Sequence, residues 1–298
     1  MKYKILITSI NGPLGYELVR YLKKNFYVIG CDSQPYGLGS KICDEFYICP
    51  HGNKREFLSF LKKISVKVDQ IFLFADEEIS NFSKNFNRFK KISSKILISN
   101  SKTIDLCNNK LKLKKYLKNY INLPKSIGRK VIIKPVVGRG SKNQIVLDSY
   151  SKKFFLNTKY KNKFFVEEYI DGKEYTIDCV FNYDSKLVFA LIRERIIKSS
   201  LSIVGKIIKD KNINLFLLKI SDKLKFIGNV NIQVIINKQG EIFLTDINPR
   251  VSGSIIFSIK AGFNPFLIAQ KILNKKKYIL PKKIKYGKIY YRYWKTYN

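Results

Sequence analysis

The sequence predicts an α/β protein whose first domain is a doubly wound parallel sheet. Strand and helix patterns alternate through the first hundred residues, as they do in parallel sheets that are covered by helices. Later in the chain, two alternating strands flank a turn that contains glycine, which indicates an antiparallel hairpin. A length of 298 residues and a hydrophobic content of 45% suit two or three small lobes, each with its own core.

The elements of the first domain are expected in the order of such a sheet. Strands are predicted at residues 4–9, 27–31, 70–74 and 95–99, with helices at 15–24 and 55–64. The loop at 9–15, with Asp32 at the end of the second strand, imitates a dinucleotide-binding fingerprint. The imitation is incomplete, because Ser9 and Asn11 stand where glycines are wanted. A protein that binds NAD(P) through this domain is therefore an alternative interpretation.

The hairpin near the end of the chain has the pattern of a metal site. Its strands are expected at 230–236 and 241–248. Side chains two apart on a strand share a face, so Asp246 and Asn248 project together, and Gln233 can join them from the partner strand. One carboxylate and two amide oxygens suit Mg²⁺, with Mn²⁺ as a second option, when nucleotide phosphates supply the other ligands. The alternative is an exposed hairpin with a polar edge.

A second segment has the composition of a phosphate-binding loop. The β-branched run 131–133 delivers Lys134 and then a loop that contains Gly138, Gly140 and Ser141. The backbone N–H groups of such a loop can surround phosphate oxygens, with the lysine as a fixed cation beside them. The alternative is an ordinary turn rich in glycine and lysine.

A third segment has the pattern of a strand edge that can bind a nucleotide, here called the nucleotide edge. The apolar run 164–166 leads into Glu167 and Glu168, and a turn at 171–172 is followed by Glu174. A purine can pair with main-chain groups along such an edge, while a carboxylate beyond the turn accepts the ribose hydroxyls.

These three segments, in this order, resemble the ATP-grasp superfamily over nearly the whole chain, most closely its branch like the large subunit of carbamoyl-phosphate synthase. The resemblance implies a pre-ATP-grasp domain at 1–101, a small mobile lobe at 102–171 and a C-terminal lobe with the metal site at 172–298. The expected activity is that of a carboxylate–amine ligase. ATP phosphorylates a carboxylate, and an amine then displaces phosphate to give an amide or peptide bond on a small molecule.

The resemblance also assigns roles to individual residues. Phosphate-binding lysines are Lys110 and Lys134, loop contacts are Gly138, Gly140 and Ser141, and nucleotide-edge contacts are Glu167, Glu168, Ile170 and Glu174. Metal ligands are Gln233, Asp246 and Asn248, and the residues expected to act on the reacting groups are Arg250, Arg193 and Lys134. Residues 205–206 would form the loop after the strand of Arg193. Asn109 and Asp246 depart from the Asp and Glu that the family usually has, so a non-catalytic ATP-binding relative is an alternative.

The net charge of +35 suggests an anionic partner, but the overall composition, rich in lysine and poor in alanine, is typical of proteins from AT-rich genomes. Lysine outnumbers arginine 48 to 9, whereas nucleic-acid binders use more arginine for bidentate contacts. We therefore expect no nucleic acid, and the resemblance implies small-molecule carboxylate and amine substrates. A basic nucleic-acid module at 275–298 is the rival interpretation. The run 290–294 alternates like a closing strand.

The remaining signals concern the setting of the protein. Five cysteines at long spacings, without a Cys-x-x-Cys pair, argue against a disulfide framework or a zinc site. They favour a reducing, cytoplasmic compartment. No apolar run approaches 18 residues, so no transmembrane segment is expected. Dimers are common among similar proteins, so a homodimer is one expected assembly.

Overall fold

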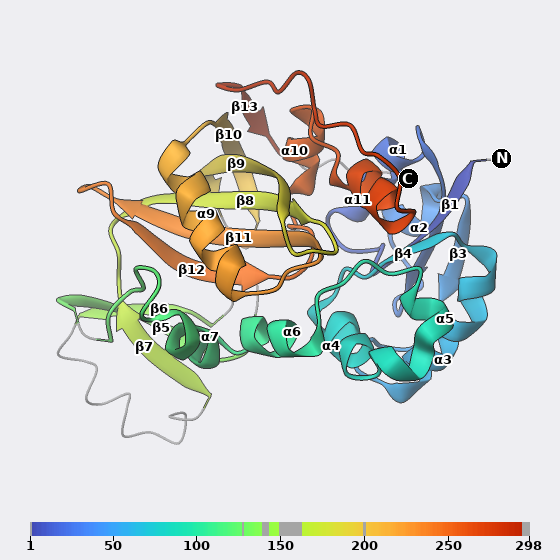
Figure 1. Ribbon diagram of the computed structural model, residues 1–298, viewed down its shortest axis with the longest axis horizontal. Helices are drawn as coiled ribbons and strands as arrows, with labels where there is room; N and C mark the ends of the chain where they lie inside the picture. Colours follow the sequence, from blue (N-terminus) through green and yellow to red (C-terminus); the bar gives the residue numbers. More distant parts are fainter. Residues whose placement is uncertain (1, 127, 139–142, 149–162, 199–200, 294–298) are drawn as a thin grey trace.

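The computed structural model describes residues 2–126, 128–138, 143–148, 163–198 and 201–293 of the chain. Within them, three sheets follow one another along the sequence (Figure 1). The first has the strand order β3-β2-β1-β4, the second β6-β5-β7, and the third β12-β11-β8-β9-β10-β13. No helix of the described residues is both long and apolar enough to cross a bilayer.

The first sheet is parallel and has helices on both faces. Its strands are β1 (Tyr3–Thr8), β2 (Phe26–Asp32), β3 (Glu45–Ile48) and β4 (Gln70–Phe72). The helices are α1 (Gly15–Leu22), α2 (Leu38–Ile42), α3 (Arg55–Ile64), η1 (Ser65–Lys67), α4 (Asp76–Lys84), η2 (Phe86–Phe89) and α5 (Lys90–Ser93). Along β1, Ile5 and Ile7 pack in the cluster with Leu18 of α1, while Leu6 packs in the cluster with Phe57 of α3. Burial on both faces explains the apolar runs 5–7 of β1 and 28–29 of β2.

Most elements expected in the first domain are confirmed, but one strand is wrong. The strands at 4–9, 27–31 and 70–74 and the helices at 15–24 and 55–64 end within two residues of their expected positions. Residues 95–99 form no strand. Ile71 donates one backbone bond to Lys95 (2.9 Å), and the chain then turns toward β11, where Ile227 N–H donates to Ser99 Oγ (3.0 Å).

The second sheet is a short antiparallel unit preceded by two capped helices. It contains β5 (Lys130–Pro135), β6 (Ile145–Asp148) and β7 (Phe164–Glu168), and it follows α6 (Ser101–Asn108) and α7 (Lys110–Leu117). Asn109 is the N-cap of α7, because its Oδ1 accepts the Lys112 N–H at 3.0 Å. Asparagine and aspartate cap helices about equally well, so Asn109 serves as well in this cap as the aspartate that the resemblance led us to expect.

The third sheet is antiparallel and carries the expected hairpin. Its strands are β8 (Gly172–Phe181), β9 (Leu187–Lys198), β10 (Ser202–Ile208), β11 (Gly228–Asn237), β12 (Ile242–Asn248) and β13 (Ile289–Tyr291), accompanied by α9 (Lys211–Lys223), α10 (Ile255–Lys260) and α11 (Pro265–Leu273). The closing strand predicted at 290–294 is confirmed at residues 290–291, whereas Arg292 and Tyr293 follow the end of β13 and Trp294 lies outside the described residues. The loop expected at 205–206 is wrong, because both residues pair with β9 inside β10.

The third sheet packs on the first through its C-terminal helices. Phe266 of α11 lies edge-on to Phe72 of β4, with ring centroids 4.9 Å apart. Lys260 of α10 contacts Glu17 of α1 at 3.0 Å. On the other face of the third sheet, α9 packs in a separate hydrophobic cluster. The end of β4 lies beside the start of β11 and the segment after β12, since residues 71–74, Asn229 and residues 249–251 line one hollow.

Glu78 is a buried carboxylate at the carboxyl end of β1 and β4. It accepts hydrogen bonds from the Thr8 hydroxyl, from Ser9 Oγ (2.8 Å) and from the backbone N–H groups of Phe74 (3.1 Å) and Ala75 (3.0 Å). Burial nevertheless raises the pKa of the Glu78 carboxyl above its usual value of 4.5.

This raised pKa predicts a pH dependence that Glu78→Gln should remove. The folded state binds the proton more tightly than the unfolded state, so the contribution is full below about pH 4.5 and declines as pH rises through the raised pKa. Urea unfolding of wild type and variant across this range measures it. The free energy of unfolding of wild type minus that of the variant should fall with rising pH. A difference that grows with pH would contradict the prediction, and Glu56→Gln, at an exposed site, should show no such trend.

Candidate active site

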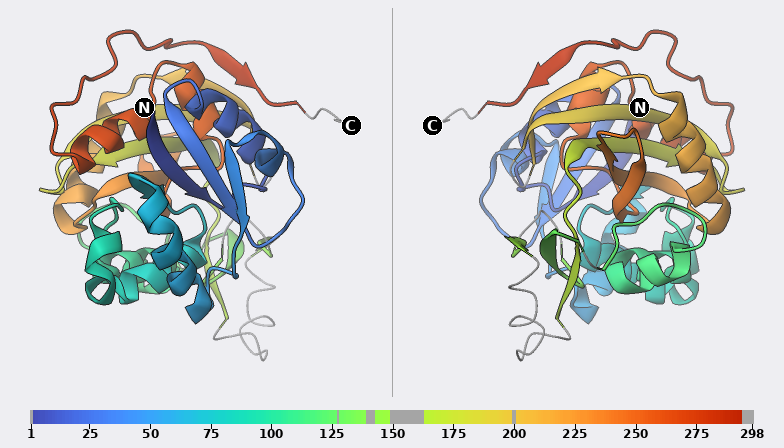
Figure 2. Two further views of the ribbon diagram at one scale, coloured as in Figure 1. Left: turned by 90° about the vertical axis from the view of Figure 1, so that its right-hand side faces the viewer. Right: turned by 90° about the vertical axis from the view of Figure 1, so that its left-hand side faces the viewer.

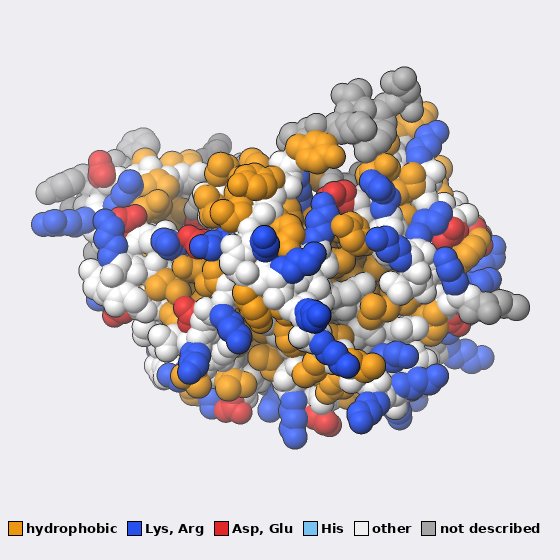
Figure 3. Space-filling view, turned by 90° about the horizontal axis from the view of Figure 1, so that it is seen from above, with side chains coloured by type: hydrophobic (Ala, Val, Ile, Leu, Met, Phe, Trp, Pro, Cys, Tyr) orange, Lys and Arg blue, Asp and Glu red, His pale blue; other side chains and the backbone are white. Residues whose placement is uncertain are grey.

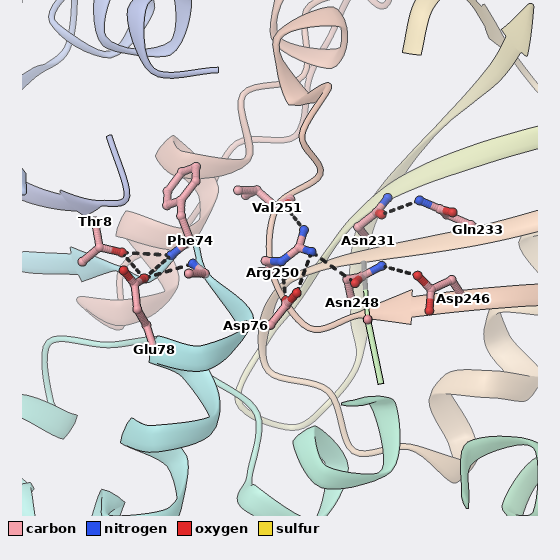
Figure 4. Close-up of polar contacts among 12 residues, drawn as sticks. Thr8, Phe74, Asp76, Glu78, Asn231, Gln233, Asp246, Asn248, Arg250 and Val251 are labelled. Atoms are coloured by element: carbon pink, nitrogen blue, oxygen red, sulfur yellow. Dashed lines mark hydrogen bonds and ion pairs between the residues drawn. The ribbon is translucent and has the colours of Figure 1, made fainter. Parts of the chain in front are cut away.

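A row of oxygen-bearing side chains lies on one face of the β11–β12 hairpin (Figure 4). Gln233 is directly opposite Asp246, and Asn231 is opposite Asn248. Asn248 Nδ2 donates to Asp246 Oδ2 at 3.1 Å, and Gln233 Nε2 lies 3.4 Å from Asn231 Oδ1. The structure therefore brings the three expected ligands together. It adds Asn231, which sequence reasoning missed although it stands two residues before Gln233 on the same face.

This oxygen row attracts positive charge. Lys110, which is buried at the start of α7, places Nζ 3.1 Å from Asp246 Oδ1 and donates to the Gly138 carbonyl at 2.9 Å. One carboxylate with neighbouring amide oxygens fits a hard cation that shares a nucleotide's phosphates. In the described part of the chain, no three His, Cys, Asp or Glu side chains gather to hold a metal by themselves. A metal bound here would therefore depend on the nucleotide.

Arg250 is held beside the row by the carboxylate of Asp76, the first residue of α4. Its Nε and Nη2 contact the two carboxylate oxygens of Asp76 at 2.5 and 3.1 Å, and Nη2 also donates to Asn248 Oδ1 at 3.2 Å (Figure 4). Burial works to lower the pKa of Arg250, but Asp76 outweighs burial and the pKa is raised. The guanidinium thus stays charged and fixed next to the expected ligands. Asp76 is a site residue that sequence reasoning missed.

Asp76→Asn is expected to lower the free energy of unfolding by about 2 kcal/mol, because Arg250 keeps its burial and loses its charged partner. Chemical denaturation measures the change. Glu56→Gln is the matched control, since Glu56 is also a carboxylate in the first turn of a helix and is exposed. An unchanged free energy of unfolding in Asp76→Asn would show that the ion pair between Asp76 and Arg250 does not stabilise the fold.

A buried charge cluster lies in the second sheet. Glu167 on β7 contacts Lys134 on β5, and its Oε2 lies 2.6 Å from Lys114 Nζ on α7. Lys114 was missed by sequence reasoning, although it stands four residues after Lys110 on the same helix face. Two lysines face one carboxylate, so the cluster keeps an excess positive charge. The side chain of Glu167 is therefore committed to the two lysines, and its backbone pairs with Ile132 of β5.

The other expected nucleotide contacts lie around the end of β7. Ile170 follows that strand, and Glu168 borders an open hollow of about 390 Å³ that Lys130 and Tyr169 also line. Glu174 lies on β8, with its Oε2 3.3 Å from Arg195 Nη1. These placements leave the nucleotide-edge roles as predictions. Gly140 and Ser141 of the expected phosphate loop lie outside the described residues.

The position of Arg193 corrects the expectation that it contacts a substrate. The residue is 0% exposed, and its Nη1 donates to the Ser254 carbonyl at 3.1 Å and lies 3.6 Å from Asp178 Oδ2. Burial lowers the pKa of Arg193. The glycine at position 205 makes room for it, because a Cβ there would approach Arg193 Cδ to 2.9 Å. Arg193 is closed off from solvent and supports the segment that follows Arg250.

The structure also disfavours the dinucleotide alternative. Both carboxylate oxygens of Asp32 accept backbone N–H groups, one from Asn11 and one from Gln34, each at 2.9 Å. The loop also bonds to itself, since Gly15 N–H donates to the Gly12 carbonyl at 2.9 Å. The carboxylate of Asp32 is thus committed to shaping the loop.

Two family models match the sequence. The model described as "ATP-grasp in the biosynthetic pathway with Ter operon" matches residues 161–290, and the model described as "PylC-like, N-terminal domain" matches residues 5–97. No curated protein matches the chain.

Several solved structures have the same fold. N5-carboxyaminoimidazole synthetase from Staphylococcus aureus, in complex with ADP, is 18% identical with a TM-score of 0.76, over 97% of this chain and 82% of that one. N5-carboxyaminoimidazole ribonucleotide synthetase from Thermotoga maritima is 19% identical with a TM-score of 0.70, over 95% and 78%. L-amino acid ligase from Bacillus licheniformis is 14% identical with a TM-score of 0.69, over 91% and 74%.

Proposed function

We propose, from the premise that this chain belongs to the ATP-grasp superfamily and has a PylC-like N-terminal domain, that it is an ATP- and Mg²⁺-dependent carboxylate–amine ligase. The observation that carries the proposal is the oxygen row of β11 and β12, bordered by Lys110 and Arg250. The ADP in the Staphylococcus aureus relative supports a nucleotide ligand. We also propose domain boundaries at 1–101, 102–171 and 172–298, since each range contains one sheet.

The reaction we propose has two steps. A carboxylate oxygen of the substrate attacks the γ-phosphorus of ATP, and the bond to ADP breaks. An amine then attacks the carbonyl carbon of the acyl-phosphate, phosphate leaves, and a proton is lost from nitrogen. Phosphoryl transfer depends mainly on positioning and charge neutralisation. The protein supplies cations for this in Lys110, Lys134 and Arg250, and no nucleophilic side chain is needed.

Asp246, Asn248 and Gln233 would hold the divalent ion, which would neutralise charge on the phosphates. The donor set contains a single carboxylate, so we expect Mg²⁺ to bind with the nucleotide rather than alone. Lys134 and Lys110 come from β5 and α7, whereas the oxygen row comes from the third sheet. The phosphates would thus lie between these two parts of the chain, which agrees with a small lobe that closes over ATP.

The first test is nucleotide binding measured by thermal shift. MgADP should raise the melting temperature by several degrees, because a ligand that binds only the folded state stabilises it. NAD⁺ and NADPH should have no effect. Lys134→Met should remove most of the shift, while Lys115→Met, an exposed lysine on α7, should keep it. No shift with MgADP, or a full shift in Lys134→Met, would contradict the proposed site.

The second test identifies the reaction. Phosphate release from ATP is measured with carboxylates and amines in pairs, beginning with amino acids because one relative is an L-amino acid ligase. Release that requires both partners, with an amide product seen by mass spectrometry, supports the ligase. Binding of MgADP without turnover of any pair would favour the non-catalytic alternative.

A further inference from the structure

Residues 274–293, here called the basic strap, form an ordered surface segment between α11 and the end of the described chain. The strap arches over the upper side of the molecule (Figures 1 and 2). Backbone bonds hold it in place: Lys285 N–H donates to the Ala261 carbonyl at 2.9 Å, and Gly287 N–H donates to the Ile207 carbonyl at 2.8 Å. Tyr278, Ile284 and Tyr290 pack inward on the cluster that includes Ile207 and Ala261. These three side chains anchor the strap.

The other large apolar side chains of the strap face outward. On β13, Tyr290 packs on the Phe257 ring at 6.1 Å between centroids, and Arg292 lies over the same ring at 5.8 Å. Because side chains alternate along a strand, Ile289 and Tyr291 face solvent. The exposed apolar and aromatic residues of the strap are Ile279, Leu280, Tyr286, Ile289, Tyr291 and Tyr293, of which Ile279 and Tyr293 are 77% exposed. The fold does not need these outward side chains for its core.

The strap is also uniformly basic. Its seven lysines are Lys275, Lys276, Lys277, Lys282, Lys283, Lys285 and Lys288, and all are exposed. It contains no acidic residue, and Asp246 is the last carboxylate side chain of the sequence. Figure 3 views the molecule from this upper side, where basic and hydrophobic side chains lie interspersed. Elsewhere in the sequence, the 22 acidic residues are distributed among the lysines.

We propose that the basic strap docks the protein on an anionic lipid bilayer. Lysines attract an anionic headgroup layer, while aliphatic and tyrosine side chains insert at the boundary between headgroups and acyl chains. A second copy of the chain would bring seven further lysines against these seven, which opposes self-association. A nucleic acid would favour arginine, and the single arginine of the strap lies over Phe257 and donates to the Gly253 carbonyl at 3.0 Å. Exposed aliphatic side chains add nothing to phosphate binding.

The test is cosedimentation of the full chain with vesicles. We expect binding to vesicles of phosphatidylglycerol and phosphatidylcholine in equal parts, and little binding to phosphatidylcholine alone. Each lysine near an anionic surface contributes roughly fivefold in affinity. A variant with Lys276→Gln, Lys277→Gln and Lys282→Gln should therefore bind roughly a hundredfold more weakly. The matched control replaces three exposed lysines of the first domain, Lys62, Lys63 and Lys91, with glutamine.

A second variant separates lipid docking from simple charge attraction. Ile279→Ser, Leu280→Ser and Tyr291→Ser together keep every charge and should still weaken binding to the anionic vesicles at least tenfold. Circular dichroism and thermal melting confirm that each variant is folded. The proposal is overturned if anionic vesicles do not bind, if the apolar variant binds like wild type, or if the control variant loses as much as the strap variant. It is also overturned if single-stranded DNA displaces the vesicles and requires the same lysines.

Discussion

Asp246→Asn is expected to lower kcat for ATP turnover by roughly a hundredfold or more, the effect typical of removing one preorganised electrostatic contact. Asp246 carries the only formal negative charge in the oxygen row, and it is the ion-pair partner of Lys110 at 3.1 Å. Asparagine keeps the size of the side chain and can still bond Asn248. The variant thus keeps the shape of the site and removes the charge that Lys110 pairs with. Turnover is measured as phosphate release with the substrate pair that the wild type uses.

The matched control for Asp246→Asn is Glu241→Gln, which removes a carboxylate from the exposed end of the same hairpin. Its kcat should stay close to that of wild type. Thermal melting of both variants shows whether the fold is kept. If Asp246→Asn turned over ATP at the wild-type rate, the assignment of the oxygen row as the metal site would be wrong. If Asp246→Asn still bound MgADP but no longer turned over ATP, Asp246 would be needed for the chemical step rather than for nucleotide binding.

Glu167→Gln is expected to lower the free energy of unfolding by about 3 kcal/mol, because removing one partner of a buried ion pair leaves the other charge uncompensated. Here two lysines lose their shared carboxylate. Lys134 and Glu167 are almost fully buried, and Lys114 is only slightly exposed. Chemical denaturation with urea measures the change, and the midpoint should fall without a change in the slope of the transition.

Glu168→Gln is the control for this second prediction, because Glu168 is the next residue of β7 and faces the opposite side of the sheet. Its effect should be within about 0.5 kcal/mol of zero. Equal losses in the two variants would show that the cluster around Glu167 contributes nothing beyond an ordinary carboxylate on this strand. Restoring stability by combining Glu167→Gln with Lys114→Met would confirm that the unpaired lysine causes the loss.

Alternation along single strands explains why the oxygen row could be predicted. Asp246 and Asn248 stand two residues apart on β12, and the short turn to β11 places Gln233 opposite Asp246. The spacing and the turn are both local, so a sequence pattern suffices to place these side chains on one face. Asn231 could have been found by the same rule. The elements β1, α1, β2, α3 and β4 were predictable for a similar reason, since periodicity is set by neighbours, whereas α2 and β3 were not predicted.

Local patterns failed where long-range contacts decide the outcome. The segment at 95–99 has the composition of a strand, but its contacts with Ile227 and Gly228 direct it toward the third sheet. Arg193 was expected to bind a substrate, but β10 and residues 252–254 pack around it and enclose it. Neither outcome depends on residues nearby in the sequence.

The sequence by itself determined the parallel order of β1, β2 and β4 and the pairing of β11 with β12, because both depend on local patterns and a short turn. Only the tertiary structure decided that Asp76 holds Arg250 across 174 residues of chain, and that Lys114 and Lys134 share Glu167. Charged groups pair when folding buries them together, whatever their separation in the chain. That is why sequence reasoning missed Asp76 and Lys114, whose partners lie far away in the chain.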